Sequence, residues 1–178
     1  YQLPASIHID QPIEMRSSEY LPLNYGAVVY KKTALAFDYL RAYLGESLYD
    51  QCMHAYFEEW KFKHPQPQDV KAVFEKVSGK NLSWFFDDLF NTTNQQDFAL
   101  RKPHLDGTKA NFTVQQRSGI AAPFVVSGLK NGTTITEQWF EADQTGRTLE
   151  IPCQGCDKLV IDPNKVMIET NYRNNGGI

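Results

Sequence analysis

The feature that most constrains this 178-residue chain is a single change in the spacing of its apolar residues. Before residue 91 they recur at helical spacing, and beyond residue 96 they alternate with polar residues, as in strands with one buried face. The stretch between, NTTNQQ at 91–96, has no apolar residue. We therefore expect an α+β chain in two segments, with antiparallel helices first and a small antiparallel β-sandwich second.

Four helices are predicted in the first segment. Gly45 and Gly79 suit the left-handed conformation that ends many helices. Pro67 is favoured in a first helical turn, and the Asn81 side chain can accept hydrogen bonds from the free amides of a last helix. The apolar side of the first helix includes Leu35. The predicted ranges are 24–44, 46–62, 67–79 and 82–90.

About seven short strands are expected between Phe98 and Tyr172, the number typical of a small sandwich. Residues 111–114 and 134–139 alternate with a period of two, which predicts strands. Asn131-Gly132 lies between two such runs and can take the positive φ angles of a tight hairpin turn.

Charge and hydropathy exclude several classes of function. The formal net charge is −3 and the pI about 5.8, so no basic field exists for nucleic acid. No apolar run approaches the roughly 20 residues that a membrane helix needs. The chain starts at Tyr1 without an initiator methionine, and we expect it to be a processed product or part of something longer.

The sequence predicts no complete metal site. HExxH is absent, and no two of the four histidines lie on one helical turn. Cys153 and Cys156 have the spacing of half a zinc site, but the only other cysteine, Cys52, lies in the helical segment. We therefore favour a turn whose two thiols can bond to each other. The histidines are His8, His54, His64 and His104.

Other arrangements of reactive side chains are equally incomplete. The acidic pairs Glu58-Glu59 and Asp87-Asp88 are adjacent on helices, where neighbours point in different directions, so solvated faces are expected. No Gly-rich phosphate loop and no G-x-S-x-G motif is present. No histidine lies close in sequence to any of three candidate nucleophiles. These are Ser18, Ser47 and Ser78.

Tyr30 stands in the mostly apolar run 28–36 and is followed by two lysines. One interpretation is packing, with the hydroxyl at the edge of the core. The other is a phenol facing a cleft, where it donates a hydrogen bond to a developing oxyanion. Spacing alone leaves both interpretations open.

Several ordered motifs resemble the M1 family of zinc aminopeptidases, the gluzincins. Tyr30-Lys-Lys-Thr resembles the family's Y-x-K-G helix, and GKNLSWFFDDLF at 79–90 resembles its G-x-D-L-S-W-F-F-D element. Residues 54–75 resemble the aromatic-rich helix and loop between these motifs. VIDPNKVMIETNYRNN at 160–175 resembles the end of the family's small β domain. The resemblance covers about 20–175.

This resemblance implies a domain organisation. Residues 1–96 are expected to form the helical C-terminal part of a thermolysin-like peptidase domain, and 97–178 an Ig-like β-sandwich. The zinc ligands of the family, HExxH and a later glutamate, would precede Tyr1. We therefore expect zinc in the intact enzyme but none in this chain, which alone is predicted to be inactive. Its expected partners are the N-terminal part of the same polypeptide and a peptide substrate.

The resemblance also assigns roles. Tyr30 matches the tyrosine that stabilises the oxyanion when the family removes amino-terminal residues from peptides, and Tyr25 is a candidate substrate contact. Lys32 matches the motif's lysine, whereas Thr33 replaces its glycine, a change that could tighten packing behind the phenol. Localisation stays open between cytosolic and exported.

Two alternatives remain at this stage. The glycyl-aminopeptidase family has a similar helix but usually continues into a PDZ domain, which the β-rich ending argues against. The chain could instead be a non-catalytic interaction module of a degenerate peptidase. An upstream HExxH followed by glutamate would distinguish an enzyme from such a module.

Overall fold

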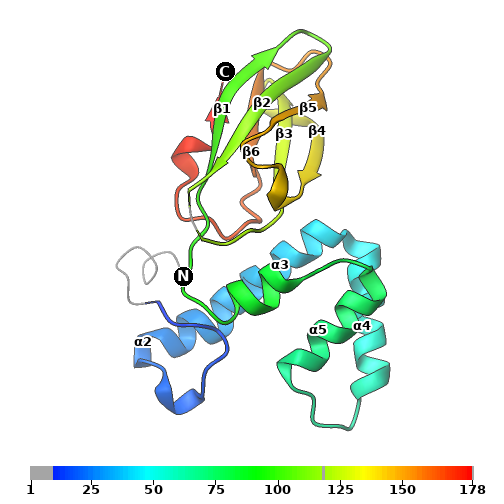
Figure 1. Ribbon diagram of the computed structural model, residues 1–178, viewed down its shortest axis with the longest axis vertical. Helices are drawn as coiled ribbons and strands as arrows, with labels where there is room; N and C mark the ends of the chain where they lie inside the picture. Colours follow the sequence, from blue (N-terminus) through cyan, green and yellow to red (C-terminus); the bar gives the residue numbers. More distant parts are fainter. Residues whose placement is uncertain (1–9, 118, 178) are drawn as a thin grey trace. The chain divides into compact units, whose positions relative to one another are not determined.

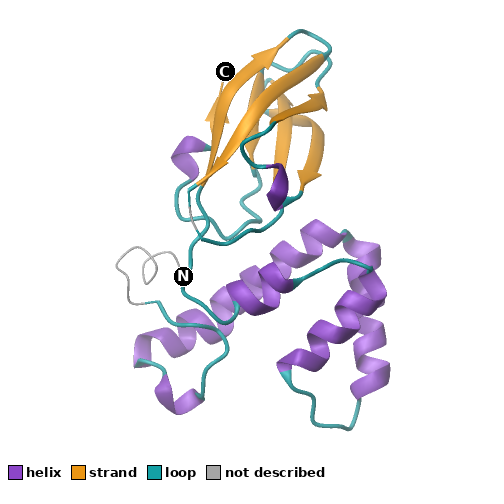
Figure 2. Cartoon of the chain, viewed as in Figure 1, coloured by secondary structure: helices purple, strands orange, loops and turns teal. Residues whose placement is uncertain are grey.

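The computed structural model describes residues 10–117 and 119–177 and divides the chain into two compact units, Tyr1–Thr93 and Asn94–Ile178. All strands of the described residues lie in the second unit, and the longer helices lie in the first (Figures 1 and 2). This confirms the expected fold class of helices followed by a β-sandwich. His8 lies outside the described residues.

After a short 3-10 helix at Ser17–Glu19, the helical unit continues with one unbroken helix of changing pitch. α2, the π-helical segment η2 and α3 follow one another without a break, and Gly45, with φ of 79°, separates α3 from α4. Helix α4 ends two residues before its predicted end. The bounds are α2 Pro22–Asn24, η2 Tyr25–Lys32, α3 Thr33–Leu44, α4 Glu46–Trp60, α5 Pro67–Ser78 and a second π-helical segment, η3, Trp84–Leu89.

The predicted helix ends are largely confirmed. α5 starts at Pro67 and is followed by Gly79 in the left-handed conformation, with φ of 67°. The Asn81 side chain accepts a hydrogen bond from the Ser83 amide at 2.9 Å, as expected of a residue that caps a helix start. Leu35 was expected on the apolar side but is 41% exposed. The buried stripe of α3 is centred on Ala36, Leu40 and Tyr43, which leaves Leu35 at its edge.

Aromatic rings form much of the core of the helical unit. Phe85 is fully buried, and its ring centroid lies 5.4 Å from Phe37, 4.8 Å from Phe86 and 4.9 Å from Phe90. Edge-to-face and tilted arrangements of this kind add to the stabilisation from buried area. This core joins α3 to η3 and fixes the helix that carries Tyr30.

The β unit contains two antiparallel sheets, ordered β1-β2-β5 and β4-β3-β6-β7. The expected count of seven strands is confirmed for the described residues, but only six of them lie within the predicted range of 98–172, because β7 lies at 176–177. Their bounds are β1 Phe98–Leu105, β2 Lys109–Gln116, β3 Phe124–Lys130, β4 Thr133–Phe140, β5 Thr148–Pro152, β6 Lys158–Ile161 and β7 Gly176–Gly177.

The sheets pack face to face through aromatic pairs. Phe98 of β1 lies 5.3 Å from Phe124 of β3, and Phe112 of β2 lies 5.8 Å from Phe140 of β4, between ring centroids. In β4 the alternation predicted a strand correctly, but Ile135 is 46% exposed. Most of β4 is solvent-accessible, because its central residues lie at the edge of the sheet outside β3.

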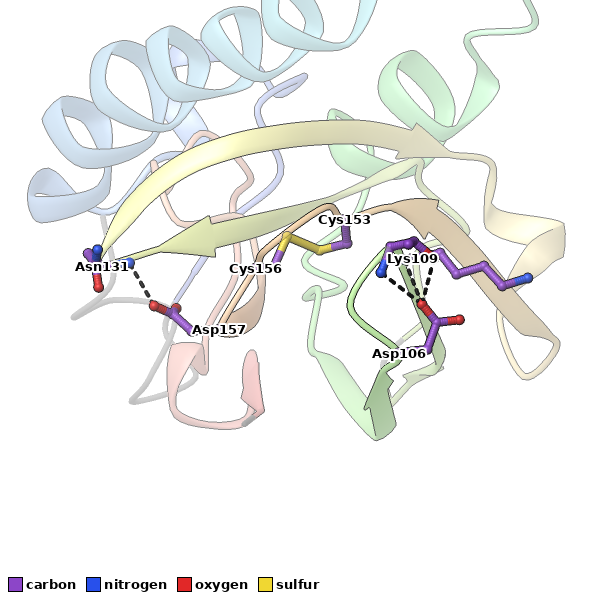
Figure 3. The surroundings of a disulfide bond; sticks show 7 residues. Asp106, Lys109, Asn131, Cys153, Cys156 and Asp157 are labelled. Carbon is purple, nitrogen blue, oxygen red and sulfur yellow. Dashed lines mark hydrogen bonds between the residues drawn. A yellow bond between two sulfur atoms is a disulfide. The ribbon is translucent and has the colours of Figure 1, made fainter.

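Turns and one disulfide close the β unit. Asn131 and Gly132 have φ angles of 50° and 79°, which confirms the predicted hairpin turn between β3 and β4. Cys153 and Cys156 form a disulfide in the turn that leads from β5 in one sheet to β6 in the other (Figure 3). Nearby, the Asp157 carboxylate accepts a hydrogen bond from the Asn131 amide at 2.7 Å. The disulfide therefore closes a connection that crosses between the sheets.

None of the helices in the described part of the chain has the length and apolar character needed to cross a membrane.

Candidate active site

Tyr30 lies on the π-helical segment η2, a wider turn than the α-helix that sequence patterns predicted for it. At its end the Thr33 amide bonds to the carbonyls of Val28 and Tyr30, and the Thr33 hydroxyl donates to the Val28 carbonyl at 3.2 Å. The threonine that replaces the motif's glycine is thus used to hold the wide turn. Such turns are rare and often occur at functional sites.

The wide winding sorts the side chains of this region into two stripes. Asn24, Val28 and Lys32, each four residues apart, are fully buried. Tyr25 and Tyr30, five residues apart, are 41% and 63% exposed. Lys32, a charged residue, is therefore buried, whereas Tyr30, two positions before it, is exposed.

Tyr25 and Tyr30 lie together at the surface. Their ring centroids are 6.0 Å apart with an interplanar angle of 71°, and Tyr25 has a similar contact with Tyr20 at 6.0 Å and 85°. No hydrogen bond occupies the Tyr30 hydroxyl within the described residues. The structure thus places the two predicted site residues side by side with an exposed phenol available as a donor.

Tyr20 is fixed rather than free. Its hydroxyl lies 2.5 Å from the carbonyl oxygen of Ile13 and 2.9 Å from that of Pro12. Burial raises the pKa of this phenol above its ordinary value. Tyr20 therefore anchors the row of rings to the preceding chain, and its hydroxyl is engaged there.

Lys32 forms a buried ion pair that the sequence did not reveal. Its ammonium lies 3.0 Å from the Asp10 carboxylate, and the two side chains are 0% and 3% exposed. Burial lowers the pKa of the lysine, and the Asp10 charge opposes that shift. The adjacent Lys31 is exposed. The four-residue spacing of Lys32 from Val28 and Asn24, which places the three residues on one face of a helix, was the available signal in the sequence.

The other candidates from the sequence form no catalytic arrangement in the described part of the chain. Glu58 pairs with Lys61 at 2.6 Å and Asp87 with Lys71 at 2.5 Å, so these carboxylates lie in exposed ion pairs. No hydrogen bond joins a serine to a histidine among Ser18, Ser47, Ser78, His54, His64 and His104.

The described residues do not fit a zinc site. No three of their His, Cys, Asp or Glu side chains are grouped so that they could hold a metal ion. The Cys153 and Cys156 sulfurs are bonded to each other, and Cys52 is buried alone. The interpretation of the cysteine pair as a bonded turn is therefore confirmed.

A separate cavity of about 630 Å³ lies in the helical unit. Its lining is mainly aromatic and aliphatic and includes Phe37, Tyr56, Val70, Phe86 and Phe90. Neither Tyr25 nor Tyr30 contributes to it. The cavity is therefore distinct from the row of exposed tyrosines.

In the β unit, Glu169 is a buried carboxylate with specific partners. Its oxygens accept hydrogen bonds from the Phe98 amide at 2.7 Å and from the Asn175 side chain at 2.6 Å. Burial raises the pKa of Glu169 to about 7, and the charges of Asp162 and Asp97 act in the same direction. These contacts tie the start of β1 to the end of the chain.

Comparison with known proteins gives one family match and similar solved structures. Residues 4–89 match the model of the peptidase family M1 domain. The crystal structure of Legionella pneumophila aminopeptidase A in complex with aspartic acid has a similar fold, with a TM-score of 0.58 and 16% sequence identity. The similarity covers 78% of this chain but only 17% of that protein. No curated protein matches the chain.

Proposed function

Because residues 4–89 match the model of the peptidase family M1 domain, we propose that this chain is the part of an aminopeptidase that supplies the oxyanion-stabilising phenol. In this proposal the complete enzyme removes amino-terminal residues from peptides, and Tyr30 donates a hydrogen bond to the substrate carbonyl oxygen as it gains charge. Residues 1–96 are assigned to the peptidase domain and 97–178 to the following Ig-like sandwich.

The observation that carries this proposal is the setting of the Tyr30 hydroxyl. The side chain is 63% exposed, yet its backbone lies in a helix anchored to a buried aromatic core. A donor on a rigid element needs little reorganisation when charge develops opposite it. The interpretation of Tyr30 as core packing, by contrast, does not fit its exposure.

The chemistry of Tyr30 follows from the charge on its partner. A phenol binds a neutral carbonyl oxygen weakly and an oxyanion strongly, so its contribution appears mainly in the transition state. In this family zinc supplies Lewis-acid activation when it is bound. We propose that its ligands lie in the N-terminal part of the same polypeptide, a placement supported by the lack of a suitable group of three His, Cys, Asp or Glu side chains among the described residues.

Exposed apolar residues support the idea that more of the peptidase domain covers this region. Leu21, Leu23, Tyr25 and Leu35 are between 41% and 59% exposed within a short stretch around η2. Surface of this kind is typical of an interface. We propose the preceding N-terminal part of the same polypeptide as its partner, with the peptide substrate bound between them at Tyr25 and Tyr30.

The test is Tyr30→Phe in the complete natural protein. We expect kcat for peptide hydrolysis to fall about 10²- to 10³-fold, with little change in KM, because only a transition-state donor is removed. Tyr25→Phe should raise KM more than it lowers kcat if Tyr25 contacts the substrate. Tyr49→Phe, on helix α4, is the matched control and should change neither. An unchanged kcat in Tyr30→Phe would remove the role assigned to Tyr30.

A further inference from the structure

We propose that Asp10 and Gln11 form a clamp that holds the π-helical segment Tyr25–Lys32 in its wide winding and so positions Tyr30. Asp10 contacts the residue at the end of this segment, and Gln11 contacts the residues that precede its start. The inference rests on the function proposed for Tyr30. Asp10, Gln11 and Lys32 are positioning residues, because they act through the helix rather than on the substrate.

The Gln11 side chain holds the start of the segment. Its carbonyl oxygen accepts hydrogen bonds from the Leu21 amide at 2.8 Å and from the Asn24 side chain at 3.0 Å. Its amide nitrogen donates to the Glu19 carbonyl at 3.0 Å. Three bonds from one side chain therefore fix the turn that enters η2.

The Asp10 side chain holds the end of the segment. One carboxylate oxygen pairs with the Lys32 ammonium at 3.0 Å, and the other accepts from the Gln11 amide at 2.9 Å. The second bond joins the two halves of the clamp. Because Asp10 and Gln11 are neighbours in the chain, the two ends of the π-helical segment are held by one short stretch of backbone.

The burial of the Lys32–Asp10 pair explains why the clamp would oppose a change of this segment from π-helical to α-helical winding. A π-helical turn is an uncommon alternative to the α-helix, so a change to α winding is the natural competitor. Such a change would rotate Tyr30 relative to Lys32 and pull the buried ammonium from its partner. A buried charge without a partner is strongly unfavourable, so the pair penalises the rewound helix.

The test compares two variants of the complete natural protein. Asp10→Leu/Lys32→Met removes both charges together, which avoids leaving one buried and unpaired. Lys31→Met removes the exposed neighbouring lysine and is the matched control. We expect the double variant to stay folded, with amide hydrogen exchange in residues 25–33 at least about tenfold faster and kcat about 10- to 100-fold lower at nearly unchanged KM. Lys31→Met should leave both readouts unchanged.

A double-mutant cycle separates positioning from general destabilisation. In the Tyr30→Phe background, Asp10→Leu/Lys32→Met should cost little further activity, because the donor that it positions is already gone. A full additional loss in that background would overturn positioning through Tyr30, and unchanged amide exchange would overturn the clamp. A third outcome separates the two proposals. If Tyr30→Phe leaves kcat unchanged but Asp10→Leu/Lys32→Met still speeds amide exchange in residues 25–33, the proposed function of Tyr30 fails and the clamp on the helix stands.

Discussion

The two units differ in how much apolar surface they leave exposed. Of nine large hydrophobic side chains that are exposed among the described residues, eight lie in the helical unit and one, Ile135, lies in the β unit. Two packed sheets can cover each other's apolar faces, whereas single helices such as α4 keep an uncovered side with Phe57 at 60% exposure. The comparison shows that, among the described residues, exposed large apolar side chains are concentrated in the helical unit.

The units also differ in how they bury charge. The helical unit buries Lys32 against Asp10, two opposite charges that satisfy each other. The β unit buries Glu169 against uncharged donors, so its carboxylate keeps a raised pKa. A paired charge makes a region sensitive to the loss of one partner, and an unpaired acid makes it sensitive to pH.

The largest expected effect tests whether the two cores are independent. Phe85→Ala in the helical unit and Phe124→Ala in the β unit each remove a fully buried ring, and each should cost about 3–5 kcal/mol of unfolding free energy. We expect each substitution to raise hydrogen exchange only in its own unit. Unfolding of both units together in either variant would show that the cores are coupled.

The next effect is a pH dependence confined to the β unit. Between its ordinary pKa of 4.5 and its folded pKa of about 7, Glu169 holds a proton that the unfolded chain releases. Stability therefore falls as pH rises from about 4.5 to about 7, by about 3 kcal/mol in total for this group. Burial raises the pKa of Asp162 as well, which gives the same sign. Chemical denaturation at several pH values, monitored by amide hydrogen exchange in β1, would measure how the unfolding free energy changes with pH.

The control for this pH dependence is a matched pair of substitutions. Glu169→Gln should flatten the slope, because no proton is then released, and Glu150→Gln should keep it, because Glu150 is an exposed partner of Lys109. An identical slope in both variants would assign the dependence to other groups.

The smallest effect concerns the disulfide. The ring that Cys153 and Cys156 close is short, so Cys153→Ser/Cys156→Ser should lower the unfolding free energy of the β unit by about 2 kcal/mol and leave the helical unit unchanged. A Cβ at Gly128 would lie 2.5 Å from the Cys153 sulfur and 2.6 Å from the Cys156 sulfur. Gly128→Ala should therefore destabilise the bonded form more than the double-serine form. Equal costs in both forms would show that the crowding is relieved elsewhere.

Local chemistry in the sequence determined the elements and many of their ends. Pro67 and Gly79 bound a helix because proline suits a first turn and glycine accepts positive φ. Asn131-Gly132 forms its hairpin turn for the same kind of reason. The change of period at 91–96 predicted the order of helices and strands. Each of these signals acts within a few residues, because short-range steric contacts determine which backbone angles a residue can adopt.

The tertiary structure decided what depends on residues far apart in the chain. The π-helical winding, the burial of Lys32 and the exposure of Tyr30 arise together, and Asp10 lies 22 positions before its partner. Glu169 is likewise buried by contacts with Phe98, 71 positions away. The ordered motifs in the sequence led to the prediction of Tyr30 and Tyr25 as site residues, but they could not reveal the Lys32–Asp10 pair, because a buried charge is stable only beside its partner. That proximity is set by packing, which no local pattern encodes.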